Sequence, residues 1–193
     1  MKYYVVKKGN KPGIYNTWDE CKAQIEGFNG AIYKSFSSLD DANNYFNDIE
    51  VKKVFDKPTA YVDGSFNEKT GEYSFGCVFL YNKKEYHFKK KFSKDELSSM
   101  RNVAGEIKGA GFIIQYCLNR NIKELVIYHD YEGIAKWYNL EWQAKLYGTQ
   151  KYQQFAVENK DNIKVSFVKV KSHTNDKYND LADLLAKEAL DLR

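Results

Sequence analysis

Residues 59–66 read TAYVDGSF, a strand-like stretch that carries a carboxylate. β-Branched and aromatic residues alternate along it, Pro58 precedes it and the turn-forming Asn67 follows it, which together predict a β-strand. Strands contain aspartate less often than almost any other residue. Asp63 therefore indicates either a structural accident at a sheet edge or part of a functional site.

The sequence that follows this stretch predicts an α/β domain over residues 58–193. Three strands joined by short turns favour an antiparallel meander, at about 59–66, 73–81 and 85–92. Further strands then alternate with helices, which favours parallel additions to the sheet. These strands are ELVIYH (124–129) and IKVSFVKV (163–170), helices lie near 102–119 and 178–191, and helical material lies around 131–158. We expect a mixed five-stranded sheet with helices on both faces.

Residues 1–46 show a second, self-contained pattern that predicts a small α+β domain. Short strands in KYYVVKK (2–8), after GNKPG (9–13) and in AIYKSF (31–36) predict a three-stranded antiparallel sheet. TWDE at residues 17–20 matches a capping box, and Ser38 precedes a second short helical segment. Residues 47–57, NDIEVKKVFDK, have mixed charge and no clear period, so we interpret them as a linker.

Composition and charge limit the classes of protein to which the chain can belong. No stretch approaches the ~18 apolar residues that a membrane span needs, and the first residues lack a signal-peptide pattern. Cys21, Cys77 and Cys117 are scattered, which argues against a disulfide framework and a thiolate zinc site. The net charge of +4 permits a phosphate-rich partner without requiring one. We therefore expect a cytoplasmic protein without membrane association.

Several acidic residues occupy positions where a carboxylate is costly. Asp63 lies within a predicted strand, and Asp130 ends LVIYHD, the carboxyl end of a strand expected to be parallel and buried. Ligand crevices form at such strand ends in α/β sheets. Glu106 shares a predicted helix face with Gly109 and Ile113. The pattern alone favours a Glu106 that skirts this face and reaches water.

Asp183 lies at the border of an apolar stripe on the last predicted helix, formed by Leu181, Leu184, Leu185 and Ala189. Taken alone, Asp183 is more readily interpreted as the partner of Lys187 in an i,i+4 ion pair. Taken together, acids on two strands and two helices suggest a site for a hard cation such as Mg²⁺, which prefers oxygen ligands. Sequence spacing leaves open whether they converge, so the residues alone indicate only a candidate site for metal-dependent phosphoryl chemistry.

In the order of its motifs the chain resembles ribonuclease H of type 1 over nearly its whole length. The resemblance is carried by YVDGSF with Asp63, RNVAGE with Glu106, IYHD with Asp130, and VKSHTNDKYNDLADLLA with His173 and Asp183. The last motif departs from the family at Asn179-Asp180, where relatives have Asn-Glu.

This resemblance implies an endoribonuclease that hydrolyses the RNA strand of RNA/DNA hybrids and leaves 5′-phosphate and 3′-hydroxyl ends. It implies that Asp63, Glu106, Asp130 and Asp183 are the metal ligands and that these four and His173 are the catalytic residues. Two Mg²⁺ ions about 4 Å apart, with Mn²⁺ as an alternative, would act on the attacking water and the leaving 3′-oxygen. His173 would aid proton transfer or product release; its alternative interpretation is a solvent-exposed loop histidine.

Cutting only RNA requires recognition of the 2′-hydroxyl groups that separate RNA from DNA. The resemblance implies that Gly64 and Ser65, beside the first aspartate, and Asn102, near the glutamate, contact the nucleic acid. Relatives often show Thr-Asn-Asn where this chain has Arg101-Asn102-Val103. Its minor-groove and DNA-phosphate contacts are therefore expected to differ in detail from those of the family.

Residues 1–46 resemble the hybrid-binding domain that precedes many such nucleases, through YYVVKKGNKPGIYNTWDEC and AIYKSF. The resemblance implies that Trp18 and Tyr33 form an aromatic surface for the DNA strand, with Tyr4 and Lys34 at phosphates. The alternative is that Trp18 packs in the small core. Ser35 stands where relatives often have a lysine, which predicts weaker binding.

Two other functions stay open at this point. One is a hybrid-binding protein whose active site has lapsed, although the presence of all four acids argues against it. The other is a different nuclease or a recombinase on the same fold, against which the N-terminal resemblance and His173 argue. We expect the partner to be an RNA/DNA hybrid duplex, and we predict a monomer without an obligate protein partner.

Overall fold

The computed structural model describes residues 2–47, 55–170 and 176–192 and divides the chain into two compact units, Met1–Lys53 and Val54–Arg193. Most of the predicted linker, residues 47–57, lies outside the described residues, and so does His173. Within the described residues, none of the helices combines the length and the apolar character that crossing a membrane requires.

The first unit is the predicted three-stranded antiparallel sheet with two helices. β1 (Tyr3–Lys8) lies between β2 (Gly13–Tyr15) and β3 (Ile32–Phe36), and the helices are α1 (Trp18–Ile25) and α2 (Leu39–Phe46). Thr17 and Glu20 form the predicted capping box, in which each side chain accepts a hydrogen bond from the other residue's backbone N–H. The buried core is thin and comprises Val5, Val6, Cys21 and Ala42.

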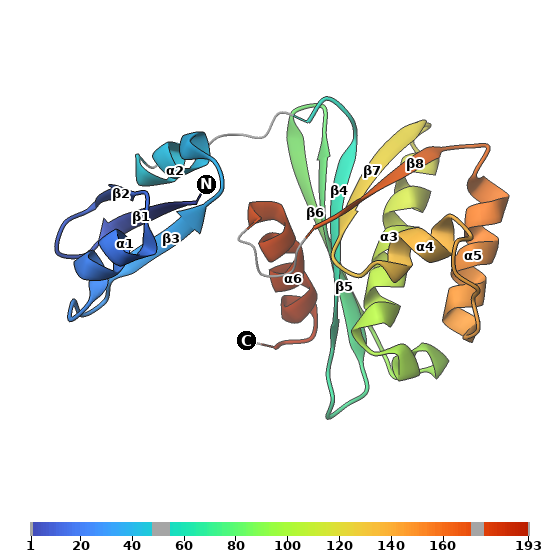
Figure 1. Ribbon diagram of the computed structural model, residues 1–193. Coiled ribbons are helices and arrows are strands. Elements are labelled where there is room, and N and C mark those ends of the chain that lie inside the picture. The colour runs from blue at the N-terminus through green and yellow to red at the C-terminus, as the bar shows by residue number, and fades with distance from the viewer. Residues whose placement is uncertain (1, 48–54, 171–175, 193) are drawn as a thin grey trace. The chain divides into compact units, whose positions relative to one another are not determined.

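The second unit contains the predicted mixed sheet, whose strand order is β6-β5-β4-β7-β8 (Figure 1). Its strands are β4 (Thr59–Phe66), β5 (Tyr73–Tyr81), β6 (Lys84–Phe92), β7 (Glu124–His129) and β8 (Lys164–Lys169). β4, β5 and β6 pair in antiparallel fashion, while β7 runs parallel to β4 and to β8. The strand that contains Asp63 is therefore central, and the accident at a sheet edge is excluded.

Helices cover both faces of this sheet, as predicted (Figure 1). α3 (Asn102–Leu118), α4 (Gly133–Tyr138) and α5 (Tyr147–Asn159) lie on one face, and α6 (Lys177–Ala189) lies on the other. The larger apolar cluster lies on the α3 side, with Phe75, Phe79 and Ile113 among its members. The smaller one joins the opposite face of the sheet to α6.

The helical material predicted around residues 131–158 is present and is divided into the two helices α4 and α5. α4 ends before Leu140, which adopts a positive φ of 63°, and the Lys136 carbonyl accepts the N–H groups of Glu141 and Trp142. A 3₁₀ helix, η1 (Glu96–Met100), also precedes α3 and was not expected.

The predicted stripe on α6 was wrong at Leu184, which is 50% exposed. Leu185 is buried as predicted, and so are Ala182 and Ala186, which the predicted stripe did not include. Gly76 on β5 explains the change, since a Cβ there would lie 2.6 Å from the Ala186 backbone nitrogen. The helix backbone approaches the sheet so closely that small alanines face it and Leu184 is turned to the solvent.

Candidate active site

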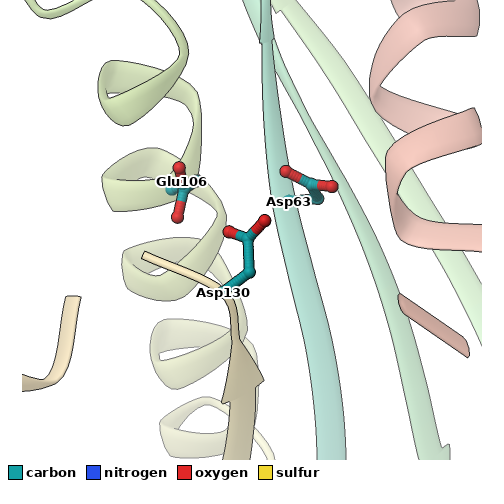
Figure 2. A group of neighbouring side chains, drawn as sticks. All are labelled: Asp63, Glu106 and Asp130. Carbon is teal, nitrogen blue, oxygen red and sulfur yellow. The ribbon is translucent and has the colours of Figure 1, made fainter. Parts of the chain in front are cut away.

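Three of the predicted acids come together at the centre of the sheet. Asp63 comes from β4, Glu106 from α3, and Asp130 from the residue directly after β7 (Figure 2). One carboxylate oxygen of each lies within 4.8 Å of the others. Because β4 and β7 are parallel neighbours and α3 packs against β4, three segments distant in the sequence supply one cluster.

Gly64 allows α3 to approach β4 closely enough to place Glu106 beside Asp63. A Cβ at Gly64 would overlap the Asn102 carbonyl oxygen and would lie 2.6 Å from the Glu106 backbone nitrogen. Both contacts are to backbone atoms, which cannot rotate away as a flexible side chain can. Glycine at the position after Asp63 is therefore a condition for the geometry of the cluster.

Burial and mutual repulsion make this cluster costly for the metal-free protein. Burial, and then the charge of Asp130, raise the pKa of Asp63 to about 7, although the Gly64 N–H donates to its Oδ1 at 2.7 Å. Burial, Asp130 and Asp63 raise the pKa of Glu106 to about 9, partly opposed by the backbone N–H of Tyr131. Glu106 is only 1% exposed, so the expectation that it skirts its helix face and reaches water is wrong.

The donor set of this cluster fits a divalent cation. Its potential ligands are carboxylate oxygens, which Mg²⁺ and Mn²⁺ prefer. Glu106 Oε2 is buried and has no hydrogen-bond partner among the described residues, which fits an oxygen that serves as a cation ligand. A bound cation would relieve the repulsion that raises the pKa values of Asp63 and Glu106.

Asp183, the fourth predicted acid, does not belong to the group of three. Its Oδ2 accepts a hydrogen bond from Lys187 Nζ at 2.6 Å, which is the i,i+4 pair expected from the pattern. Asp183 nevertheless lies near enough to Asp63 for its charge to contribute to the raised pKa of that carboxyl, and Lys187 opposes this effect. The pair with Lys187 and a position beside the cluster are both observed.

The residues predicted to contact nucleic acid near the cluster lie around the start of α3. Gly64 and the buried Ser65 follow Asp63 on β4, and the exposed Asn102 is the first residue of α3. Arg101 precedes it with a positive φ of 56°, forms an ion pair with Glu68 and lies 5.6 Å from the Phe66 ring. Arg101, at which the chain departs from the Thr-Asn-Asn of its relatives, is thus held by an ion pair and a ring contact.

In the first unit, three predicted aromatic residues form a cluster that reaches the solvent. The Trp18 ring lies 5.8 Å from the rings of both Tyr4 and Tyr33. Trp18 is 42% exposed and Tyr33 is 48% exposed, so the alternative in which Trp18 packs in the core is wrong. Lys34, the fourth predicted residue, is half-buried, and its Nζ lies 5.4 Å from the Tyr45 ring centroid.

Sequence reasoning missed two residues that contact the acidic cluster or adjoin it. His129, the last residue of β7, is 1% exposed and hydrogen-bonds the carbonyl of Tyr131, whose backbone N–H faces Glu106. The alternation of Leu125, Ile127 and His129, all buried, was a signal for His129. For Tyr131 no signal existed, because it acts through its backbone.

The strand order and the central acidic cluster define a protein of the RNase H-like class. The RNase H1 of the halophilic archaeon Halobacterium salinarum NRC-1 aligns with 70% of this chain and 98% of its own, with a TM-score of 0.58 and 19% identity. LC11-RNase H1, isolated from compost and solved in complex with an RNA/DNA hybrid, aligns with 69% and 99%, with a TM-score of 0.52 and 15% identity. At these identities the likeness establishes the fold.

The chain belongs to the RNase H family. The family described as RNase H matches residues 56–191, more than half of the chain, and the Ribonuclease H1 N-terminal domain matches residues 2–46.

Curated relatives share only a short segment with the chain. Ribonuclease H of Saccharomyces cerevisiae is 54% identical over 43 residues, which are 22% of this chain and 12% of that protein. Human Ribonuclease H1 is 42% identical over 40 residues, which are 21% of this chain and 14% of that protein. The alignments therefore span far less than two thirds of the relatives' own lengths.

Proposed function

We propose that the protein is an endoribonuclease that hydrolyses the RNA strand of RNA/DNA hybrids with the help of divalent metal ions. The observation that carries the proposal is the convergence of Asp63, Glu106 and Asp130 from three separate elements into one buried cluster. Membership of the RNase H family and the match to the Ribonuclease H1 N-terminal domain support the choice of substrate. The products would carry 5′-phosphate and 3′-hydroxyl ends.

Asp63, Glu106, Asp130 and Asp183 would hold two Mg²⁺ ions, or Mn²⁺ in their place. Such ions, when bound, supply a nucleophilic water at neutral pH and stabilise charge on the attacking and leaving oxygens. Asp63, on the central strand, and Asp130, at a strand end, would keep fixed positions because the sheet holds their backbones. Asp183 would join them through a change of partner from Lys187, which then neutralises part of the site's charge.

Three positions near the cluster would bind the substrate, and His173 would move protons or assist product release. The backbone at Gly64 and Ser65 and the exposed side chain of Asn102 adjoin the cluster, so they can contact 2′-hydroxyl groups close to the cleaved bond. A histidine can accept and donate a proton near neutral pH. These assignments follow the family motif residue by residue.

The first unit would bind the hybrid through its exposed aromatic cluster of Tyr4, Trp18 and Tyr33, with Lys34 near phosphates. Aromatic faces stack on bases or sugars of any sequence, and lysines add an attraction that salt screens. This unit would supply affinity without sequence preference, while the second unit would supply cleavage.

The proposal is tested with a hybrid whose RNA and DNA strands carry different end labels, incubated with Mg²⁺ and the full chain. We expect the intact chain to cut only the RNA strand and Asp130→Asn to lose at least about 100-fold in rate. Asp161→Asn makes the same chemical change at an exposed turn outside the cluster and should cut at the rate of the intact chain. Product ends are identified by their sensitivity to phosphatase and their competence for ligation.

The same assay separates the alternatives. Tight hybrid binding without cleavage in Mg²⁺ or Mn²⁺ would contradict the proposal and leave a binding protein. Cleavage of duplex DNA at a rate equal to that of the hybrid would point instead to another nuclease on this fold. Equal losses in Asp130→Asn and Asp161→Asn would show that the acidic cluster is not the site of the reaction.

A further inference from the structure

His129 is a polar residue on a buried strand face whose other residues are apolar. It is the last residue of β7 and lies on the strand face that also carries Leu125 and Ile127, all three being almost fully buried. The ring of Phe167 on β8 packs edge-on against the imidazole at 5.7 Å. A buried imidazole is tolerated where its nitrogen atoms have hydrogen-bond partners.

His129 has a hydrogen-bond partner at Tyr131, the residue that follows Asp130 in the sequence. The imidazole Nδ1 is 2.9 Å from the carbonyl oxygen of Tyr131. A carbonyl oxygen only accepts hydrogen bonds, so Nδ1 carries the hydrogen and donates it. This bond closes a short loop around Asp130 and fixes the backbone on both sides of that carboxylate.

The same peptide segment also reaches Glu106, the acid that α3 supplies. The backbone N–H of Tyr131 faces the carboxylate of Glu106 and stabilises its charged form. The carbonyl of Tyr131 is thus held by His129 while its N–H is directed toward Glu106. Two of the three clustered acids therefore depend on one backbone conformation, and the His129 side chain is a restraint on it.

We propose that His129 is a positioning residue that sets the backbone at Asp130 and Tyr131 and so arranges the carboxylates for metal binding. This inference rests on the proposed metal-dependent function of the cluster. His129 acts only through the backbone it holds and touches neither metal nor substrate. Its loss should weaken metal binding and leave hybrid binding unchanged.

Three substitutions isolate the donated hydrogen bond. In His129→Asn the amide nitrogen can occupy the place of Nδ1 and donate to Tyr131, in His129→Gln the amide is displaced toward the position of Nε2, and His129→Leu has no donor. Binding of Mn²⁺ to the full chain is measured by isothermal titration calorimetry without nucleic acid. We expect the affinity of the Asn variant to lie within about 3-fold of the intact chain and those of Gln and Leu to fall about 10- to 100-fold, the range for a residue that orients a metal ligand.

Hybrid binding in EDTA and cleavage at saturating hybrid provide the second readout. We expect unchanged hybrid affinity in all variants and a higher Mg²⁺ requirement for cleavage in Gln and Leu only. His87→Leu, a similar change at an exposed histidine of β6, should match the intact chain. If the Leu variant fails to fold, the contrast between Asn and Gln, two amide side chains, still decides the matter.

Equal Mn²⁺ affinity in the Asn, Gln and intact chains would overturn the inference, and so would an Asn variant as weak as Gln. A loss of hybrid affinity equal to the loss of metal affinity would also overturn it, since a general loosening of the unit would then be responsible. Failure of the proposed function has a different signature: the intact chain binds Mn²⁺ in the titration but does not cut the hybrid.

Discussion

The two units place their candidate functional groups in opposite ways. In the first unit, Trp18 and Tyr33 lie on the surface of a small sheet with a thin core. In the second, Glu106 is buried against backbone and the pKa values of Asp63 and Glu106 are raised. An exposed ring needs only a surface that supports it, whereas a buried carboxylate needs a close-packed framework that holds it at an energetic cost. Function in the first unit should therefore tolerate local change, and in the second it should not.

The largest expected effect is that of Glu106→Gln, which should cut cleavage by at least about 100-fold and yet stabilise the metal-free protein. The ordinary pKa of a glutamate is near 4.5 and the folded one is about 9. As the pH rises between these values, the unfolded chain loses its proton while the folded chain keeps it, so the metal-free protein loses stability. Above the pKa of Glu106 in the folded protein this loss of stability is complete, and below the ordinary pKa of a glutamate it is absent.

We therefore expect Glu106→Gln in EDTA to gain roughly 1–3 kcal/mol at pH 8 and much less at pH 5, measured by urea unfolding. Glu158→Gln makes the same change on the exposed face of α5 and should show no pH-dependent gain. A Gln variant less stable than the intact chain at pH 8 would mean that the buried carboxylate is not strained, and the contrast between the units would fail.

Gly64→Ala should have the next largest effect, because its Cβ would push α3 away from β4. A displacement of this kind can cost about 100-fold in rate, and overpacking costs about 1–3 kcal/mol. Gly111→Ala is the matched control, since a Cβ there meets open space; it should stabilise the helix by about 0.5–1 kcal/mol. Both are measured by cleavage rate and urea unfolding, and an active, stable Gly64→Ala would show that close approach is dispensable.

Trp18→Ala should weaken hybrid binding by about 10-fold and leave the cleavage rate at saturating hybrid unchanged, because it removes stacking from the first unit alone. Fluorescence anisotropy with a labelled hybrid measures the affinity. Leu39→Ala removes an equally exposed apolar side chain elsewhere in the unit and should have no effect. A fall in the cleavage rate at saturating hybrid would instead show that the first unit takes part in the reaction.

The smallest effect is expected for Thr17→Ala, which removes the capping box at the start of α1. The loss should be about 1 kcal/mol of stability in the first unit, with less effect on hybrid affinity than Trp18→Ala. Local stability is read from amide hydrogen exchange within α1. Exchange that changes equally in the second unit would contradict a loss of stability confined to the first unit.

Local patterns in the sequence predicted the elements well, since period, caps and turn residues act over a few neighbours. Asp63 was identifiable because aspartate is unusual in a strand, and Asp130 because it follows one. The burial of Glu106 was not, because it depends on Gly64, forty-two positions away in the sequence, letting a helix approach the sheet. The small residues that α6 presents to Gly76 were missed for the same reason.

Asp183 combines one feature that the sequence pattern predicts with one that it does not. Its pair with Lys187 is a local feature of one helix and followed from spacing, but its position near Asp63 depends on where α6 lies on the sheet. The sequence predicts helical material around residues 131–158 but not where it divides into α4 and α5, because Leu140, a residue with no turn preference, adopts a positive φ there. Apart from this local break, the predictions fail where one segment sets the environment of a distant one.

The parallel pairing of β4 with β7 also bears on the order in which the molecule folds. β4, β5 and β6 are joined by short turns, whereas Thr59 finds Val126 only after α3 has crossed over the sheet. Pairing across so long a loop is slow to form. We expect the amides of β5 to gain protection before those of β7 in pulse-labelled hydrogen exchange during refolding. The carboxylates would then remain hydrated and apart through most of folding, and their repulsion would act only on the final step of assembly.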